Sequence, residues 1–217
     1  MIRRLRGHAS RGPRGQAMVE MAMILPILLL LVLGMLEFGI AFDHNLTLEY
    51  ATREGARTGA ALANGGGPLG CAMGPPQQSP NQNKVDPAII EAVQRVLTSA
   101  GSPVDVSEVL QIRIYKADAN GDEVSPAKVN RWVYVGPGMG DLSVQGLVDG
   151  TSRLDFRADT AVQSWLTCTR TNADPPDSVG VSLVYKYSFQ TPLGALLSLV
   201  EIDMHDRTVM ALNPTNK

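Results

Sequence analysis

The feature that most limits how this chain can fold is a long apolar run close to its N-terminus. The twenty residues from Ala17 to Leu36 contain one ionisable side chain, that of Glu20. A helix of about 20 residues spans the ~30 Å hydrocarbon core of a bilayer, so this run predicts a transmembrane helix. Pro26 lies inside it, and membrane helices tolerate proline better than helices in water do.

The charges on either side of the run indicate its orientation. Glu37 and Asp43 follow it, and the segment before it contains five arginines and no acidic residue. Positive side chains favour the cytoplasmic side of a membrane, which places the N-terminus inside and the rest of the chain outside. The arginines are Arg3, Arg4, Arg6, Arg11 and Arg14.

A cleaved secretory signal peptide is the alternative interpretation of the same segment. Its basic start would fit, but the apolar part of a signal peptide is usually only about 7–15 residues long. The sequence after Leu36, Glu37-Phe38-Gly39-Ile40-Ala41-Phe42, also makes a poor cleavage site. We therefore favour an anchor that stays attached.

The overall charge argues against a protein that binds nucleic acid. The formal net charge is −2, and removing the five N-terminal arginines leaves −7 for residues 16–217. A surface that follows phosphates needs clustered Lys and Arg side chains. No nucleic-acid partner is predicted, and the basic cluster is interpreted as an orientation signal.

The stretch Arg14-Gly15-Gln16-Ala17-Met18-Val19-Glu20, directly before the main apolar run, resembles the processing site of type IV prepilins. The resemblance implies that a membrane prepilin peptidase cuts after Gly15, which leaves Gln16 as the new N-terminus and Glu20 at the fifth mature position. A carboxylate at the centre of a membrane costs about 2.5–3.5 kcal/mol, and less near the surface. Pairing of Glu20 with the new α-amine of a neighbouring subunit would offset that cost. Alternatively, Glu20 simply lies among the lipid headgroups.

A longer part of the chain is similar to the start of TadE-like proteins. It has the motif GQ-x-x-VE before the apolar run, a proline early in the run and the motif EFG directly after it. Further along, Glu49–Arg57 is similar to the A-x-REGAR stretch of that family. These similarities cover about Arg14–Ala61. The segment from Val179 to Gln190, with Pro192, loosely resembles the closing pattern of the family.

The resemblance implies a minor pseudopilin that acts in the assembly, initiation or tip structure of a Tad-type surface pilus. The implied partners are other pilin and pseudopilin subunits, the prepilin peptidase, the Tad inner-membrane assembly platform and membrane lipid. The implied location is the cytoplasmic membrane, followed by incorporation into the pilus. Two other hypotheses stay open: a membrane-anchored binding or adhesion protein that never enters a filament, and a secreted enzyme freed by signal peptidase.

The helical pattern continues beyond the membrane run, to about residue 63. Ala51, Gly55 and Gly59 recur every four residues and so lie on one face, where another helix can approach closely. Glycine inside a helix costs up to about 1 kcal/mol relative to alanine, which suggests that the glycines serve packing. This face is predicted to pack either into a filament or against the protein's own domain.

The rest of the chain predicts an extracytoplasmic α+β domain over residues 86–217, with a small antiparallel sheet against the long helix. Residues 64–85 are rich in Gly, Pro, Asn and Gln and are predicted to form a loop. Asp86 and Pro87 predict the start of a helix, with Asp86 as its N-cap, that ends at Gly101. Strands are predicted at Val109–Tyr115, Arg131–Val135 and Val179–Phe189. The last element, Leu193–Met204, is expected to begin as a helix.

The two cysteines, Cys71 and Cys168, allow one pairing and have no metal-ligand spacing. Because the predicted topology exposes them to an oxidising compartment, a disulfide is favoured over two separate thiols.

No catalytic site, cofactor or metal is predicted, and the chain is not expected to be an enzyme. The segment Asp118–Glu123 partly resembles a calcium loop, but Glu123 replaces the turn glycine, and a polar turn is favoured. A second acidic group near the C-terminus fits no zinc site or catalytic triad and is expected to be solvated. This group consists of Asp203, His205 and Asp206.

Overall fold

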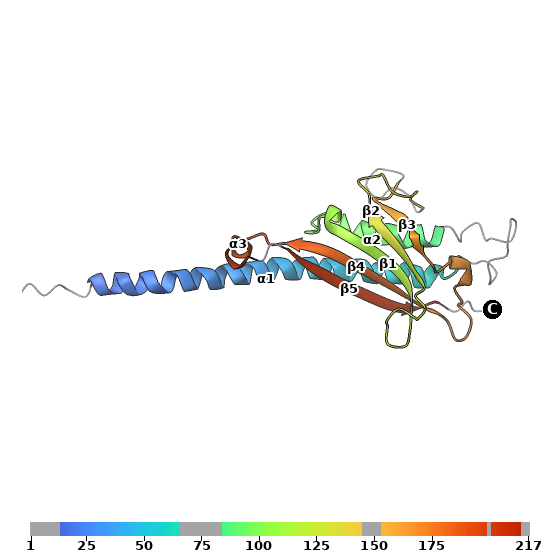
Figure 1. Ribbon diagram of the computed structural model, residues 1–217, viewed down its shortest axis with the longest axis horizontal. Coiled ribbons are helices and arrows are strands. Elements are labelled where there is room, and N and C mark those ends of the chain that lie inside the picture. Colours follow the sequence, from blue (N-terminus) through green and yellow to red (C-terminus); the bar gives the residue numbers. More distant parts are fainter. Residues whose placement is uncertain (1–13, 66–83, 145–152, 199–200, 214–217) are drawn as a thin grey trace, which may run out of the picture.

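The computed structural model describes residues 14–65, 84–144, 153–198 and 201–213. Its dominant element is one long helix, α1, which runs from Arg14 to Leu62 without interruption and contains Pro26. Figure 1 shows that the first half of α1 extends away from the rest of the molecule, whereas the second half lies along an α+β domain. The predicted fold class, a long N-terminal helix continuing into an antiparallel-sheet domain, is confirmed.

The sheet of the domain has five strands in the order β3-β2-β1-β4-β5, and all neighbours are antiparallel. The strands are β1 (Val109–Ala117), β2 (Val129–Tyr134), β3 (Phe156–Gln163), β4 (Ser178–Ser188) and β5 (Glu201–Ala211). The helices are α2 (Val85–Leu97) and the short α3 (Leu193–Leu197), and 3-10 turns cover Val106–Glu108 (η2) and Thr167–Thr169 (η3).

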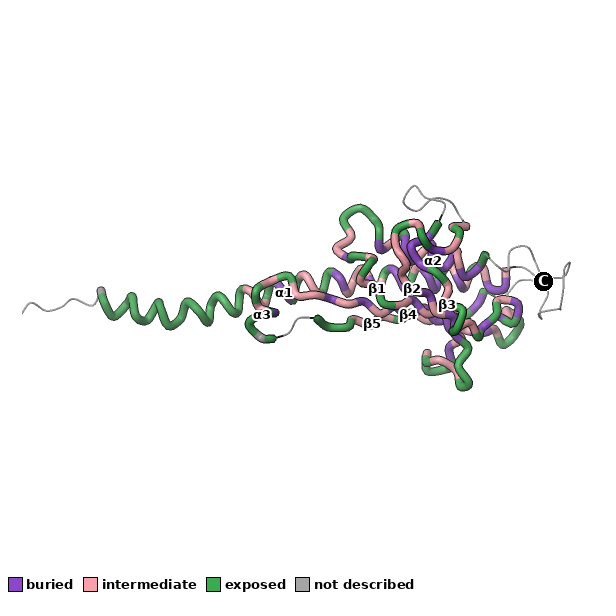
Figure 2. Tube along the Cα trace, turned by 45° about the horizontal axis from the view of Figure 1, so that its top comes forward, coloured by how far each residue is buried: buried purple, intermediate pink, exposed green. Residues whose placement is uncertain are grey.

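The core of the domain lies between the helices and one face of the sheet. Helix α1 packs on β4 and β5, and α2 packs against α1. Strand β4 alternates as predicted, so that one face of it is buried while the other is half exposed. Figure 2 shows the contrast along α1, whose free half is exposed and whose other half contributes buried residues. The buried β4 side chains are Val179, Val181, Leu183, Tyr185 and Tyr187.

The start of α2 differs from the prediction. Asp86 is not the N-cap: the helix begins at Val85, and Lys84 precedes it without a side-chain capping bond. Instead, the Asp86 carboxylate turns inward and pairs with Arg170. The helix also ends earlier than expected, at Leu97, and Gly101 lies in the turn beyond it with a φ of +89°.

The end of the chain also differs. The apolar segment that was expected to begin as a helix does so only over α3, because Ser198 follows in the left-handed region and stops the helix. The chain then returns as β5, which pairs with β4 over its whole length, from Glu201 opposite Ser188 to Ala211 opposite Ser178. This pairing provides hydrogen-bond partners for the backbone groups on the side of β5 that faces β4.

Candidate functional site on the N-terminal helix

The free half of α1 is long and apolar enough to cross a membrane. The most apolar stretch of 18 residues in this helix is not buried by the rest of the protein. The free half therefore differs from the core helix of a globular domain. Most of its large side chains, from Met18 to Leu36, are about half exposed or more, and Leu33 is partly buried. The length and this exposure suggest a single membrane anchor near the N-terminus.

The predicted processing residues lie at the beginning of this helix. Gly15 and Gln16 belong to the first turn of α1. The part of the leader that precedes Arg14 lies outside the described residues. Glu20 lies one turn further on, where the side-chain amide of Gln16 donates a hydrogen bond of 3.0 Å to its carboxylate. Both residues are exposed, so the Glu20 carboxylate remains accessible from outside the chain.

The small residues of the predicted packing face lie inside the domain, which is one of the two predicted alternatives. A Cβ atom added to Gly55 would lie 2.6 Å from Val93 Cγ2 of α2 and 3.3 Å from Val181 Cγ1 of β4. At Gly59 it would lie 3.0 Å from Ile89 Cδ1. Ala51 is fully buried in the same core. The stripe therefore lets α1 approach α2 and the sheet closely, which is the own-domain alternative.

We expect Gly55→Ala to lower the free energy of unfolding by about 1–3 kcal/mol, because the added methyl group overlaps the short, branched side chain of Val93. The better helix propensity of alanine offsets at most about 1 kcal/mol of this loss. Gly39→Ala is the matched control, since a Cβ there meets nothing within 4 Å. Guanidinium unfolding of the full chain in detergent micelles measures both variants. Equal stability of the two would contradict the packing role of Gly55.

The opposite face of α1 is not covered by the domain. Tyr50, Arg53 and Arg57 lie on this face and are exposed. Arg53 pairs with Glu49 and Arg57 with Glu54, one turn away along the helix, which holds the arginines in an ordered row. The two arginines of the REGAR segment therefore face outward, while its glycine and alanine face the core.

A buried carboxylate at the end of the apolar run joins α1 to the sheet. In the sequence this residue is recognisable only as an acidic residue that follows the run. Glu37 is 4 % exposed. It accepts hydrogen bonds from the Tyr187 hydroxyl at 2.5 Å, the Gln190 amide at 3.0 Å and the Thr191 amide at 2.8 Å. These donors come from the end of β4 and the chain just beyond it. Glu37 thus fixes the β4–β5 connection to α1.

Aromatic rings pack around this contact. His44 lies about two turns along α1 from Glu37. It is buried beside Tyr185 and Tyr187, with ring centroids 5.8 and 5.1 Å away. Its Nδ1–H donates to the Ile40 carbonyl at 2.9 Å. Burial raises the pKa of Tyr187 far above its ordinary value, and the bond to Glu37 acts in the same direction. The hydroxyl therefore remains a donor to Glu37.

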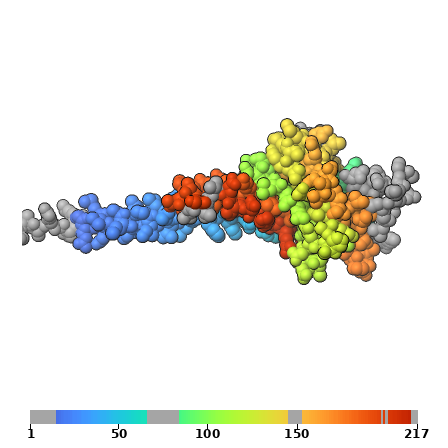
Figure 3. Space-filling view, viewed as in Figure 1, coloured from blue at the N-terminus to red at the C-terminus, as the bar shows by residue number. Residues whose placement is uncertain are grey.

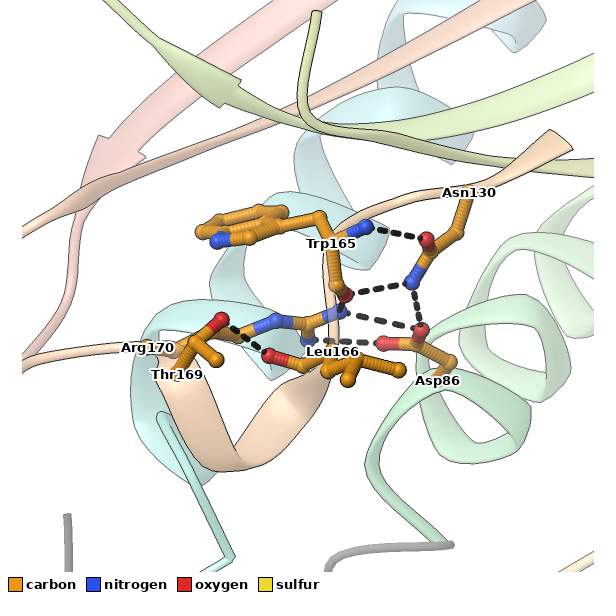
Figure 4. A network of polar contacts seen from close by, with 6 residues as sticks. All are labelled: Asp86, Asn130, Trp165, Leu166, Thr169 and Arg170. Carbon is orange, nitrogen blue, oxygen red and sulfur yellow. Dashed lines mark hydrogen bonds and ion pairs between the residues drawn. The ribbon is translucent and has the colours of Figure 1, made fainter. Parts of the chain in front are cut away.

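Figure 4 shows a second buried polar cluster, which joins the start of α2 to the turn around η3. The guanidinium of Arg170 binds both carboxylate oxygens of Asp86, at 2.7 and 3.0 Å, and lies 4.3 Å from the centre of the Trp165 ring. Asn130 donates to Asp86 at 2.6 Å and to the Trp165 carbonyl at 2.8 Å. Because these groups are buried and bind one another, the cluster holds the turn around η3 against α2.

The same turn carries one of the two cysteines. Cys168 is buried in η3 and is bonded as a disulfide. Cys71 lies outside the described residues, as does most of the predicted loop over residues 64–85. The pairing of these two cysteines therefore stays a prediction.

In the two remaining acidic groups, Asp118 and Asp206 have structural partners, whereas Asp203 and His205 are exposed as expected. The Asp118 side chain accepts from the amides of Asn120 and Asp122, at 2.8 and 3.0 Å, which makes a polar turn with Gly121 at a φ of +83°. Asp206 was expected to be solvated, but it is half buried on β5 and contacts the Thr52 hydroxyl of α1. Within the described residues, no group of three or more His, Cys, Asp or Glu side chains is placed to hold a metal ion.

These observations define a class of protein: one N-terminal helix able to cross a membrane, whose second half is built into the core of an α+β domain. The family model described as TadE-like protein matches residues 15–57, which confirms the resemblance over this segment. A TadE-like segment implies a Tad pilus-associated protein. The match does not reach Val179–Pro192, where a looser similarity was expected. No curated protein and no solved structure matches the chain.

Proposed function

We propose that this protein is a minor pseudopilin, a non-catalytic subunit that acts in the assembly, initiation or tip structure of a Tad-type pilus. The observation that carries the proposal is the uninterrupted helix α1, which joins an uncovered apolar half to the core of the domain and has a TadE-like sequence over residues 15–57. Its apolar half lies in the bilayer before assembly and against the helices of other subunits afterwards. Both environments remove its side chains from water.

The proposed processing step separates the basic leader from this helix. The five leader arginines keep the N-terminus in the cytoplasm, where the prepilin peptidase cuts between Gly15 and Gln16. Cutting creates a positive α-amine on Gln16, four residues from Glu20. In a bundle of apolar helices, the accessible Glu20 carboxylate of one subunit pairs with the new amine of the next, so that neither charge is buried alone.

We expect Glu20→Ala to leave membrane insertion intact and to reduce the amount of assembled pilus by roughly tenfold or more. The variant loses the carboxylate that balances the amine of the neighbouring subunit, while the apolar span keeps its length. Immunoblots of the membrane fraction and of sheared surface fibres measure insertion and assembly separately. Glu49→Ala is the control, because Glu49 lies beyond the apolar run and pairs with Arg53 at the surface. Unchanged piliation in the Glu20 variant would remove Glu20 from this role.

The N-terminal sequence of the purified protein separates this proposal from its alternatives. A chain from the membrane and fibre fractions that starts at Gln16 supports the pseudopilin. A chain that retains Met1 and occurs in the membrane fraction without entering the fibres would instead fit a membrane-anchored binding or adhesion protein. A start beyond Leu36 would mean that the apolar run is removed, and both anchored hypotheses would fail.

A further inference from the structure

The connection between β4 and β5 has an unusual composition. From Ser188 to Val200 the sequence contains no charged residue, and it is bounded by the surface ion pair between Lys186 and Glu201, at 2.6 Å. Helix α3 lies in this connection. Leu196 of α3 is 65 % exposed, and Ala195 beside it is also exposed. The domain thus presents an uncharged, apolar tip that its own core does not cover.

The position of this tip along α1 is fixed. Glu37, the first residue after the apolar run, binds the amides of Gln190 and Thr191, and α3 begins two residues later. The twenty residues from Ala17 to Leu36 rise by about 30 Å as a helix, which equals the thickness of the hydrocarbon core. The tip is therefore held at the level where the apolar run ends. Figures 1 and 3 show α3 against α1, at the end of the domain from which the free helix extends.

The surface of α1 just beyond the apolar run is also apolar and exposed. Phe38 and Phe42 follow the apolar run, are 73 % and 53 % exposed, and stack with ring centroids 6.3 Å apart. Apolar and aromatic side chains at this depth partition into the boundary between lipid headgroups and acyl chains. The tip and these two rings thus lie at the same level of α1, directly beyond the end of the apolar run.

We propose that the tip formed by Gln190–Ser198 is a second membrane contact, which rests in the interfacial layer of the bilayer that α1 crosses. The occupant of this surface is lipid rather than another protein, because Glu37 fixes the tip at the boundary of the membrane span. The contact belongs to the membrane-anchored state and does not depend on whether the protein later enters a pilus.

Tryptophan quenching by brominated phosphatidylcholine, in vesicles that contain the full chain, tests this proposal. We expect the tryptophan of Leu196→Trp to be quenched at least twofold more by bromines near the top of the acyl chain than by unbrominated lipid. Leu166→Trp, at an exposed leucine of the turn that carries η3, should show no such quenching. The buried Trp132 and Trp165 give a background that is measured in the unchanged chain. Ala195→Trp provides a second label on the tip.

Met35→Trp separates the membrane span from the tip, because Met35 lies near the end of the apolar run and is largely exposed. Quenching of Met35→Trp together with no quenching at positions 195 and 196 would overturn the proposed contact while leaving the anchor intact. No quenching at position 35 would overturn the span and the contact together. A blue-shifted emission at position 196 that depends on the protein-to-lipid ratio and not on bromine would identify a protein occupant and would also overturn the proposal.

Discussion

Replacement of Arg170 by methionine is expected to lower the free energy of unfolding by about 3–5 kcal/mol. The guanidinium is 1 % exposed and is the cation that balances Asp86. Methionine fills much of the same volume but leaves the Asp86 carboxylate buried with only the Asn130 amide to stabilise its charge. Guanidinium unfolding of the oxidised full chain in detergent micelles, followed by circular dichroism, measures this loss.

Arg207→Met is the matched control for this experiment. Arg207 pairs with Asp122, but both side chains are more than half exposed. Exposed ion pairs contribute only about 0–1 kcal/mol, because water solvates the separated charges well. A loss for Arg170→Met that is no larger than the loss for Arg207→Met would show that the cluster in Figure 4 does not hold the turn against α2.

Glu37→Ala is expected to release the β4–β5 connection from α1. The Tyr187 hydroxyl and two backbone amides would lose their common acceptor, and a buried donor without a partner costs about 1–3 kcal/mol. We therefore expect the amides of Gln190 and Thr191 to exchange with solvent roughly ten- to a hundredfold faster. Hydrogen exchange of the full chain in micelles, read by mass spectrometry of the peptide that contains both amides, measures the change.

The control for this variant is Glu54→Ala, which removes a partly exposed carboxylate from the same helix. It should leave exchange at Gln190 and Thr191 unchanged. Exchange in β1, at the centre of the sheet, should change in neither variant, which separates local release from global unfolding. Unchanged exchange at Gln190 and Thr191 in Glu37→Ala would show that other contacts fix the connection.

The sequence predicted those parts of the fold in which one physical effect dominates. The apolar run has to leave water, and it predicted the free half of α1. The four-residue spacing of Ala51, Gly55 and Gly59 predicted close packing on one face. The alternation from Val179 onward predicted β4, because side chains on one face of this strand are buried under α1 while its backbone pairs with the central strand β1.

Other parts depend on contacts between distant residues, which a local pattern does not contain. Asp86 has the residue type and position of an N-cap, but Arg170, 84 residues away, binds its carboxylate instead. Strand β3 was not predicted because it is an edge strand whose side chains are mostly partly buried or exposed and do not alternate. Strand β5 was not predicted because its inward positions include Asp206 and Thr208, which find polar partners on α1.

The contact of Glu37 with the end of β4 was not predicted, for the same reason. Glu37 looks like an ordinary charge that ends a membrane segment, and its interaction with Tyr187 spans 150 residues of sequence. A carboxylate directly after an apolar run, on a helix that continues, was the available signal. This signal indicates a contact only when the structure shows that the amides of Gln190 and Thr191 lie beside Glu37.

The continuity of α1 has a mechanical consequence. Since no hinge or linker separates the membrane half from the half in the domain core, a pull or twist applied to the span passes directly into the packing around Ala51 and Gly55. A tilt of the membrane span therefore tilts the whole domain by the same angle. A subunit extracted from the bilayer would therefore travel as one rigid piece, carrying its orientation with it.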